Sequence, residues 1–248
     1  MNSDQSNQFP ELLPLGLDGI LVRFSDRLDD AANRAALAFR AAIESDRPAG
    51  VVETASSLTS VLVRFRPDKV HRAELGEVLG ARASERDWLA APKPAGRLWR
   101  IPVAFGGRHG PQLAEAALAA GVDEEQAAAE ICAADLRVLA LGFAPGQPYL
   151  GFLPPNWDIP RQSAVSPAVP RGAIVVAVRQ VIPFAQPSPT GWRQVGRTAF
   201  RCYDPGRENP LPLAAGDAVR FEPVTAEALD RLFSAADSLG GAVAEELA

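Results

Sequence analysis

The feature that most restricts the fold is a segment dense in glycine and proline, residues 141–154, which reads LGFAPGQPYLGFLP. Three Gly and three Pro within these residues disfavour a helix or a plain strand, because glycine costs backbone entropy and proline lacks an N–H donor. The segment predicts an ordered loop that leaves a strand. Its amides and aromatic rings would face a ligand, or would plug the end of a barrel as a structural turn.

A second segment of this kind spans residues 188–198 and reads SPTGWRQVGRT. Its hydroxyl, amide and guanidinium groups are hydrogen-bond donors, and its indole offers a stacking face. This combination suits an anionic or amide-bearing ligand.

The sequence after residue 97 is typical of an all-β domain with helical additions. Many short β-type runs separated by Gly and Pro predict a closed barrel or a sandwich, and a final helix is predicted over residues 225–247. The expected strands are 98–105, 138–143, 173–178, 200–203 and 218–221, and the expected shorter helices are 111–120 and 124–132.

The first part of the chain has a different pattern. A strand at 20–24, a helix with apolar steps of three and four over 28–43, and strands at 51–54 and 58–65 precede a helix that opens near Pro67. This order predicts a small α+β domain.

A linker containing proline and glycine, AAPKPAG at residues 90–96, marks the expected boundary between domains at 1–92 and 97–248. Trp88 and Trp99 flank this linker, so we expect them to pack between the two domains.

Composition excludes several classes of function. The net charge of −5 provides no basic field for nucleic acid. No apolar run is long enough to cross a membrane, and the first eight residues lack a targeting pattern, so a cytoplasmic protein is expected. The only lysines, Lys69 and Lys93, lie in no phosphate-binding loop motif.

With two His and two Cys in the chain, no zinc-binding spacing exists, and no metal site is predicted. We expect Cys132 and Cys202 to be buried free thiols and His109 to be structural. Asp217 is most simply read as the cap of a turn that leads into a strand.

The order of motifs along the chain resembles one family, which includes the 5-oxoprolinase B subunit, allophanate hydrolase subunit 1 and the sporulation kinase inhibitor KipI. The motifs are R-I-P-V at 100–103, G-G-x-x-G-P-x-L at 106–113, G-F-x-P-G-x-x-Y-L-G-x-L-P at 142–154, P-R at 160–161, V-P-x-G at 169–172, S-P-x-G-W-x-x-x-G-R-T at 188–198 and P-L-x-x-G-D-x-V-R-F at 212–221.

This resemblance implies an α+β fold: a small α+β N-terminal domain, then a cyclophilin-like β-barrel domain and a C-terminal helix. It also implies a KipA-like, subunit-C-like partner and a LamB/YcsF-type ring-opening subunit. In such a system the assembly uses ATP and Mg²⁺ to open the lactam of 5-oxoproline. Phosphorylation of the amide oxygen creates a leaving group, and the developing charge then needs positioned donors.

Carried onto this chain, the resemblance suggests a set of site residues with roles assigned from side-chain type. Arg161 and Arg197 would be the catalytic, anion-binding groups, although Arg161 could instead pair with Asp158. The expected substrate- or ATP-binding residues are the polar Gln147, Gln180, Ser188, Thr190 and Thr198, the aromatic walls Tyr149 and Trp192, and the close-approach glycines Gly146, Gly191 and Gly196.

The chain also departs from the family pattern. Gln147-Pro148 stands where Phe and a small residue are common, and Thr190 replaces a glycine. Ala168 occupies the place of a second arginine, and a histidine expected near Ile131 is missing. These departures allow another substrate, and the function expected from the resemblance is that of a subunit of an ATP-dependent amide or lactam hydrolase of the 5-oxoprolinase type. Two alternatives remain: a KipI-like inhibitor of a sensor histidine kinase, or a urea-carboxylase-like carboxyltransferase domain.

Overall fold

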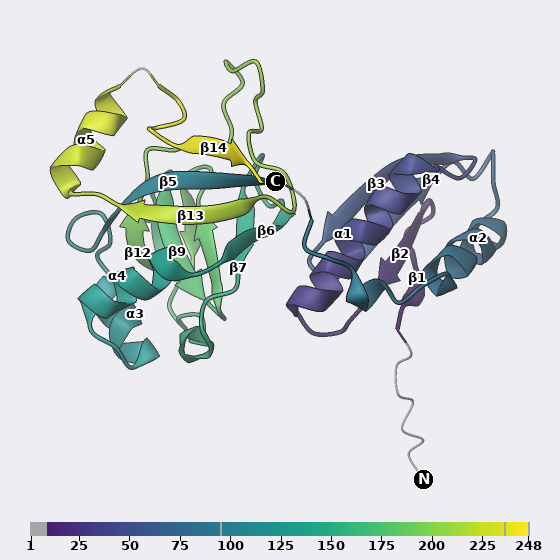
Figure 1. Ribbon diagram of the computed structural model, residues 1–248, viewed down its shortest axis with the longest axis horizontal. Helices are drawn as coiled ribbons and strands as arrows, with labels where there is room; N and C mark the ends of the chain where they lie inside the picture. Colours follow the sequence, from purple (N-terminus) through teal and green to yellow (C-terminus); the bar gives the residue numbers. More distant parts are fainter. Residues whose placement is uncertain (1–8, 95, 236, 248) are drawn as a thin grey trace, which may run out of the picture. The chain divides into compact units, whose positions relative to one another are not determined.

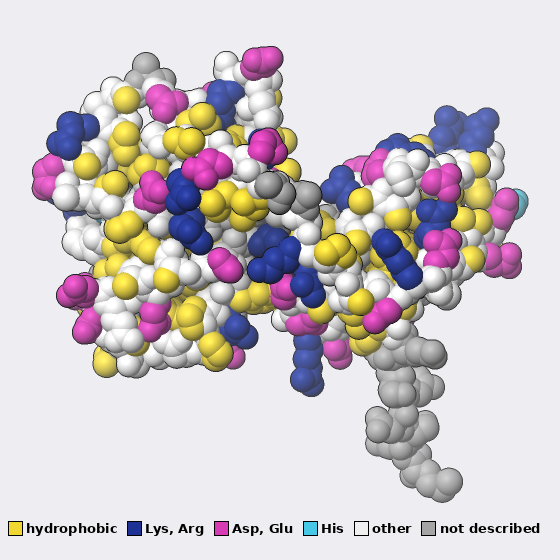
Figure 2. All heavy atoms as spheres, in the orientation of Figure 1, with side chains coloured by type: hydrophobic (Ala, Val, Ile, Leu, Met, Phe, Trp, Pro, Cys, Tyr) yellow, Lys and Arg dark blue, Asp and Glu magenta, His cyan; other side chains and the backbone are white. Residues whose placement is uncertain are grey.

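The computed structural model describes residues 9–94, 96–235 and 237–247, so the polar first eight residues lie outside this description. The chain divides into two units, Met1–Pro94 and Ala95–Ala248 (Figure 1). No helix within the described ranges combines the length and the apolar character that a membrane span requires. On the visible face of each unit, acidic and basic side chains are interspersed (Figure 2).

The first unit is a four-stranded antiparallel sheet with two helices and a short 3-10 helix (Figure 1). Helix α1 begins after Asp29, whose carboxylate accepts the Ala32 amide at 2.8 Å and so satisfies a free N–H of the first turn. The sheet order is β1 (Glu11–Leu15), β2 (Gly19–Arg23), β4 (Ser60–Phe65), β3 (Val51–Ser57), and the helices are α1 (Asp30–Ser45), α2 (Arg72–Ser84) and η1 (Trp88–Ala90).

An aromatic cluster on α1 forms the centre of this unit. The Phe39 ring lies 5.5 Å from the Phe24 ring and 5.1 Å from the Trp88 ring, both in edge-to-face geometry. The Trp88 indole N–H donates to the Ala83 carbonyl at 3.1 Å. The expected packing of Trp88 between domains is therefore wrong, because its ring belongs to the core of the first unit.

The prediction for this unit missed one strand and began its second helix too early. The sequence does not predict strand β1, because it is a half-exposed edge strand without a clear alternation. Helix α2 begins at Arg72, since the amides of Lys69 and Val70 both donate to the Arg66 carbonyl and form a separate turn after Pro67.

The second unit is a closed seven-stranded barrel with one added strand, β14, on the edge of β5 (Figure 1). Pairing of β12 with β5 closes the barrel. In order around the barrel the strands are β12 (Arg193–Arg197), β9 (Ala173–Ala177), β10 (Gln180–Pro183), β7 (Pro148–Gly151), β6 (Leu136–Leu141), β13 (Ala218–Pro223) and β5 (Arg97–Phe105), followed by β14 (Val243–Glu246).

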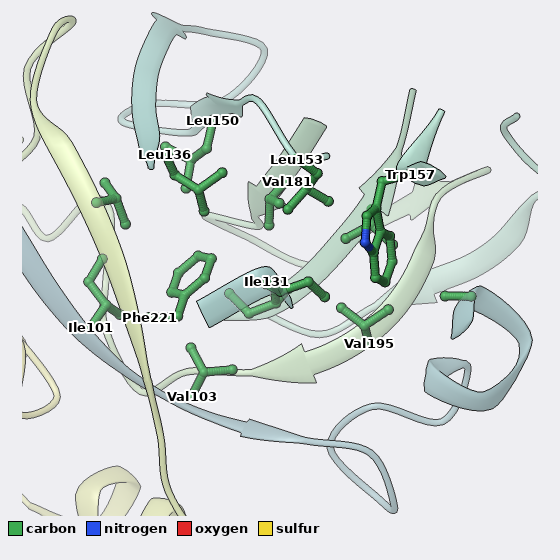
Figure 3. Close-up of a cluster of buried hydrophobic side chains, with 14 of the residues drawn as sticks. Ile101, Val103, Ile131, Leu136, Leu150, Leu153, Trp157, Val181, Val195 and Phe221 are labelled. Carbon is green, nitrogen blue, oxygen red and sulfur yellow. The ribbon is translucent and has the colours of Figure 1, made fainter. Parts of the chain in front are cut away.

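A separate two-stranded antiparallel sheet and four helical segments complete the unit. Alternate strand residues fill the barrel interior, where Ile101, Val103, Leu150 and Phe221 point toward one another (Figure 3). The two-stranded sheet pairs β8 (Ser166–Val169) with β11 (Ser188–Thr190), and the helices are α3 (Leu113–Ala120), α4 (Glu124–Ala133), η2 (Pro155–Trp157) and α5 (Ala226–Ser234).

Both Gly- and Pro-rich segments contain strands, so the prediction that residues 141–154 hold no plain strand is wrong in part. Residues 142–147 form a loop, and β7 follows it, paired on both sides with β6 and β10. Pro148 is the first residue of β7, where a missing N–H is tolerated. The high proline content therefore predicts the turn correctly but gives no signal for the strand that follows it.

The C-terminal helix is shorter than predicted. Helix α5 ends at Ser234, and the chain then turns back to add β14 to β5. The Asp237 carboxylate accepts the amides of Leu239 and Gly241, and Gly240 and Gly241 both have positive φ, which no helix accommodates. The expected strand at 200–203 is also absent from the described structure; the Phe200 ring instead packs 5.6 Å from Trp99.

Asp217 does more than cap a turn. Its side chain is 4% exposed and accepts the Arg97 guanidinium at 2.8 Å, the Trp99 indole N–H at 3.1 Å and the Ala214 amide at 2.9 Å. The expected placement of Trp99 between domains is wrong, because this bond and the contact with Phe200 hold it in the barrel. One carboxylate thus joins the start of β5 to the turn before β13.

We expect Asp217→Ala to destabilise the chain by about 3 kcal/mol, because it leaves a buried indole and a guanidinium without their acceptor. Urea unfolding followed by tryptophan fluorescence measures this change. Asp217→Asn, which keeps an acceptor oxygen, should lose less, and the exposed Asp158→Ala should stay within about 0.5 kcal/mol of the unaltered chain. Equal effects of Asp217→Ala and Asp158→Ala would contradict this role.

Candidate functional site

One cavity of the barrel unit lies where five segments of the chain meet, and its volume is about 520 Å³. The segments are the loop before β7, the turn between β8 and β9, the loop between β10 and β11, the end of β12, and the loop after residue 202; the first, second and fourth lie within the family-like motifs. The lining residues are Ala144, Pro145, Pro170, Arg171, Ala185, Gln186, Pro187, Arg197, Tyr203 and Pro205.

Two glycines allow these loops to approach one another. Gly146 has a φ of +70°, and a Cβ there would lie 2.3 Å from the Cys202 carbonyl oxygen. Gly172 has a φ of +79°, and a Cβ there would lie 2.1 Å from the Thr198 carbonyl oxygen. A side chain at either position would meet both strain and a backbone clash. The expected close approach at Gly146 is therefore made to another loop of the chain.

Two arginines provide the charge of the cavity. The Arg197 Nε donates to the Arg171 carbonyl at 3.2 Å, and the Arg197 guanidinium carbon lies 4.5 Å from the Phe233 ring centroid of α5. Burial, followed by the Arg171 charge, lowers the pKa of the Arg197 guanidinium, and Asp230 acts more weakly in the opposite sense. Among the described residues that line the cavity there is no Asp or Glu.

The second predicted catalytic arginine lies elsewhere on the barrel. Arg161 is exposed, and its guanidinium carbon lies 5.3 Å from the Trp192 ring, so it stacks on an aromatic face. Trp192 precedes β12 and Arg197 ends it, a separation of roughly 16 Å along a strand. Arg161 and Arg197 therefore lie at opposite ends of β12 and do not share the cavity.

The two predicted aromatic walls do lie together. Trp192 is buried in a cluster on the outer side of β9 and β10, and Tyr149 packs against the same cluster. Trp192 and Tyr149 thus stay near Arg161, and neither lines the cavity that contains Arg197.

Several predicted ligand-binding residues form hydrogen bonds with backbone groups of the chain. The buried Gln147 accepts the Ala185 amide through Oε1 at 3.3 Å and so supports the cavity from behind. Thr190 and Thr198 accept amides two residues further along the chain, and the Ser188 hydroxyl donates to the Gln186 carbonyl at 3.4 Å.

The remaining predicted positions are close-packed. A Cβ at Gly191 would lie 3.1 Å from the Gln162 carbonyl oxygen, and one at Gly196 would lie 2.9 Å from the Ala104 carbonyl oxygen. Gln180 is buried, and its Nε2 has no hydrogen-bond partner within the described residues.

Sequence reasoning missed three polar residues of the cavity: Arg171, Gln186 and Tyr203. Arg171 is the variable position of the V-P-x-G motif at 169–172, whose fixed residues form the turn on either side of it. A signal for Arg171 is present in the sequence, since an arginine between Pro and Gly has to project from a tight turn.

His109 supports the far side of Arg197. It is 4% exposed, its ring lies 6.4 Å from Phe233, and its Nε2 lies 3.4 Å from the Asp230 carboxylate, which also pairs with Arg108. Burial, and then the Arg108 charge, lowers the pKa of His109. The structural role expected for His109 is consistent with these contacts.

The thiols and carboxylates offer no further catalytic centre in the part of the chain that the structure describes. Burial raises the pKa of Cys132 to about 11 and that of Cys202 to about 12, so both stay protonated near neutral pH. Cys202 is buried as expected, whereas Cys132 is half-buried. No group of three or more His, Cys, Asp or Glu side chains among the described residues is placed to hold a metal ion.

The fold and the site together define a protein class: an α+β chain with a small α+β unit and a cyclophilin-like barrel that carries an arginine-lined cavity at its loops. Comparison with known families identifies the family to which the chain belongs. Residues 10–213 match the family described as "Carboxyltransferase domain, subdomain C and D", and the chain belongs to that family.

Curated relatives agree with this placement. Over 133 residues the chain is 38% identical to the 5-oxoprolinase B subunit of Escherichia coli O157:H7, covering 54% of this chain and 61% of that protein. Over 215 residues it is 29% identical to the 5-oxoprolinase B subunit of Bacillus subtilis, covering 84% of this chain and 90% of that protein. The chain thus spans about three fifths of the E. coli relative.

Solved structures share the fold. The crystal structure of TTHA0988 superposes with a TM-score of 0.70 at 32% identity, covering 83% of this chain and 39% of that one. The Kluyveromyces lactis urea amidolyase superposes with a TM-score of 0.73 at 21% identity, covering 93% of this chain and 16% of that one, which supports the fold alone.

We expect acidification to lower the stability of the chain partly because of His109. Its pKa is lowered from the ordinary value of 6.5, so the unfolded chain binds the proton first. This contribution is complete above pH 6.5 and is lost as the pH falls toward the folded-state pKa, with a slope of at most about 1.4 kcal/mol per pH unit. Urea unfolding between pH 7.5 and 5 should give a shallower pH dependence for His109→Gln; the same dependence in both chains would contradict this assignment.

Proposed function

We propose that this chain is a non-autonomous subunit of an ATP-dependent amide or lactam hydrolase of the 5-oxoprolinase type, working in the cytoplasm. The reaction would convert 5-oxo-L-proline, ATP and water to L-glutamate, ADP and phosphate. The observation that carries the proposal is the convergence of five segments, three of them within the family-like motifs, on one cavity with two arginines, in a chain related to the 5-oxoprolinase B subunit.

The proposed partners are a KipA-like, subunit-C-like chain and a LamB/YcsF-type ring-opening subunit. ATP and Mg²⁺ are assigned to the assembly. Mg²⁺ is normally held by carboxylates and phosphate oxygens, and the described lining of this cavity contains no carboxylate, so the residues present do not fit a Mg²⁺ site. They fit an anionic group, which two guanidiniums can bind.

Within this scheme the contribution of the chain is electrostatic. Hydrolysis of an amide develops negative charge on oxygen, and preorganised cationic donors stabilise that charge more in a partly buried site than in water. Arg197 meets this requirement, because its guanidinium is held by Phe233 and by the Arg171 carbonyl before any ligand arrives. Arg161, stacked on Trp192, is proposed as a second anion contact at the other end of β12.

The test is phosphate release by this chain assembled with its two partners, with ATP and Mg²⁺, in the presence and absence of 5-oxo-L-proline. Arg197→Ala should lower substrate-dependent release by about 10²-fold, the effect expected when one charge-stabilising donor is removed. Arg161→Ala should also lower it. Arg220→Ala, an exposed arginine on β13, is the control and should leave the rate unchanged.

Each outcome decides a different point. Release that does not depend on 5-oxo-L-proline, or that persists when this chain is omitted, would contradict the proposed function. Full activity of both Arg197→Ala and Arg161→Ala in intact complexes would leave the function in place and overturn the site assignment.

A further inference from the structure

The sheet of the first unit carries apolar side chains on both of its faces. On the inner face, Val22 and Val63 belong to the buried core together with Phe39 of α1. Leu21 and Leu62 are next to these valines in β2 and β4, so they lie on the outer face, where both are partly exposed. A sheet with one solvated face usually alternates apolar and polar residues, whereas strands covered on both faces have continuous apolar runs. The runs Ile-Leu-Val in β2 and Val-Leu-Val in β4 therefore indicate a sheet whose outer face is covered as well.

The apolar residues of the outer face form one row across the whole sheet. Leu13 of β1 lies opposite Leu21 of β2, which in turn lies opposite Leu62 of β4. Leu62 lies opposite Ala55 of β3, and all four residues, which we call the outer row, are partly exposed. Leu15, two residues along β1, is 49% exposed and widens the apolar surface. Single exposed leucines are common on protein surfaces, but a continuous apolar patch with a polar rim marks an interaction site.

Charged side chains flank the outer row, and they are paired within the sheet. Arg23 forms an ion pair with Glu11 on one side of the row. On the other side Arg64 forms ion pairs with Asp18 at 2.6 Å and with Glu53 at 3.1 Å. An apolar centre with a polar rim is the usual arrangement of a protein interface. Because these charges are matched within one copy, the face does not repel an identical face.

The outer row is complementary to itself in a two-fold arrangement. A two-fold axis nearly parallel to the strands, between β2 and β4, exchanges β2 with β4 and β1 with β3 in a second copy. It places Leu21 over Leu62 of the second copy, at the centre of the contact. At each edge it places Leu13 over Ala55 of the second copy, so that a large side chain meets a small one. Such an axis keeps the strands of the two sheets within the roughly 30° that face-to-face packing requires.

The same axis keeps like charges apart. It places Arg23 over Ser60 of the second copy and Arg64 over Gly19 of the second copy, so neither guanidinium meets another. The size of the face predicts reversible association. Four strands of about five residues span roughly 19 Å by 17 Å, or about 300 Å² of flat sheet on each copy. This area is smaller than that of permanent dimers, so we expect a dissociation constant on the order of 10–100 µM.

We infer that the outer face of this sheet binds the same face of a second copy of the chain, with the outer row at the centre of the interface. The contact uses the first unit alone. It therefore does not depend on the proposed function, which concerns the cavity of the barrel unit.

Sedimentation velocity of the full chain, at concentrations from about 1 µM to about 1 mM, tests this association. The weight-average mass should rise from the monomer value toward twice that value. Leu21→Glu and Leu62→Lys should each weaken self-association at least tenfold, because each buries an unpaired charge in the contact. Leu118→Glu introduces the same charge as Leu21→Glu at a residue of α3 that is 80% exposed, and it should dimerise like the unaltered chain.

Mixing the two variants tests the geometry and also controls for folding. In a heterodimer of Leu21→Glu with Leu62→Lys, the introduced carboxylate faces the introduced ammonium at one contact, and leucine faces leucine at the other. An equimolar mixture should therefore associate more tightly than either variant alone. If circular dichroism shows that one of these variants is unfolded, Leu13→Glu with Ala55→Lys makes the same exchange at the edge of the row.

Three results would overturn the inference. A monomer at every concentration would mean that the outer row only stabilises its own sheet or contacts a different protein. A dimer that folded Leu21→Glu and Leu62→Lys both retain would place the contact elsewhere. Folded variants whose mixture associates no better than each alone would contradict the two-fold arrangement. None of these results bears on phosphate release, so the proposed function is tested separately.

Discussion

The pairing of β12 with β5 is the constraint on which the barrel unit depends. It joins Gly196 to Phe105 and Arg197 to Ala104, and it turns an open sheet into a closed barrel. Gly196 makes this pairing possible, because a Cβ there would lie 2.9 Å from the Ala104 carbonyl oxygen. The same pairing fixes the backbone of Arg197 at the rim. The strand pairing that closes the barrel therefore also sets the position of Arg197 at the cavity.

Closure also explains why Arg197 can be kept partly buried without an acidic partner. Desolvating a guanidinium is costly, and an aromatic face and a backbone carbonyl offset part of that cost without neutralising the charge. Phe233 and the Arg171 carbonyl provide these two contacts. A carboxylate in their place would stabilise the free protein more and would compete with any anionic ligand. The observed environment orients the guanidinium and leaves its charge available.

Elements with strong periodicity can be predicted from the sequence, and prediction fails where pairing with distant strands decides the structure. Helix α1 is recognisable because its apolar residues repeat with the helical period, and strand β9 is recognisable as a short continuous apolar run. Strand β7 is not recognisable, because it lies in a Pro-rich segment and is formed by pairing with β6 and β10, which local sequence does not encode. At the site, Arg197 is a fixed residue of its motif, whereas Arg171 occupies the variable position of the V-P-x-G motif and was passed over. The distance of Arg161 from Arg197 could not be predicted, because it depends on the length and direction of β12.

The C-terminal segment has a larger part in this site than its distance from the motifs suggests. The family match ends at residue 213, before β13 begins at Ala218. Strand β13 bridges β5 and β6, so the barrel is incomplete without it. Helix α5 then contributes Phe233, which lies between the His109 ring and the Arg197 guanidinium. The short β14 holds the end of the segment against β5. Residues 214–247 thus complete both the barrel and the environment of Arg197, and the matched region alone would have neither.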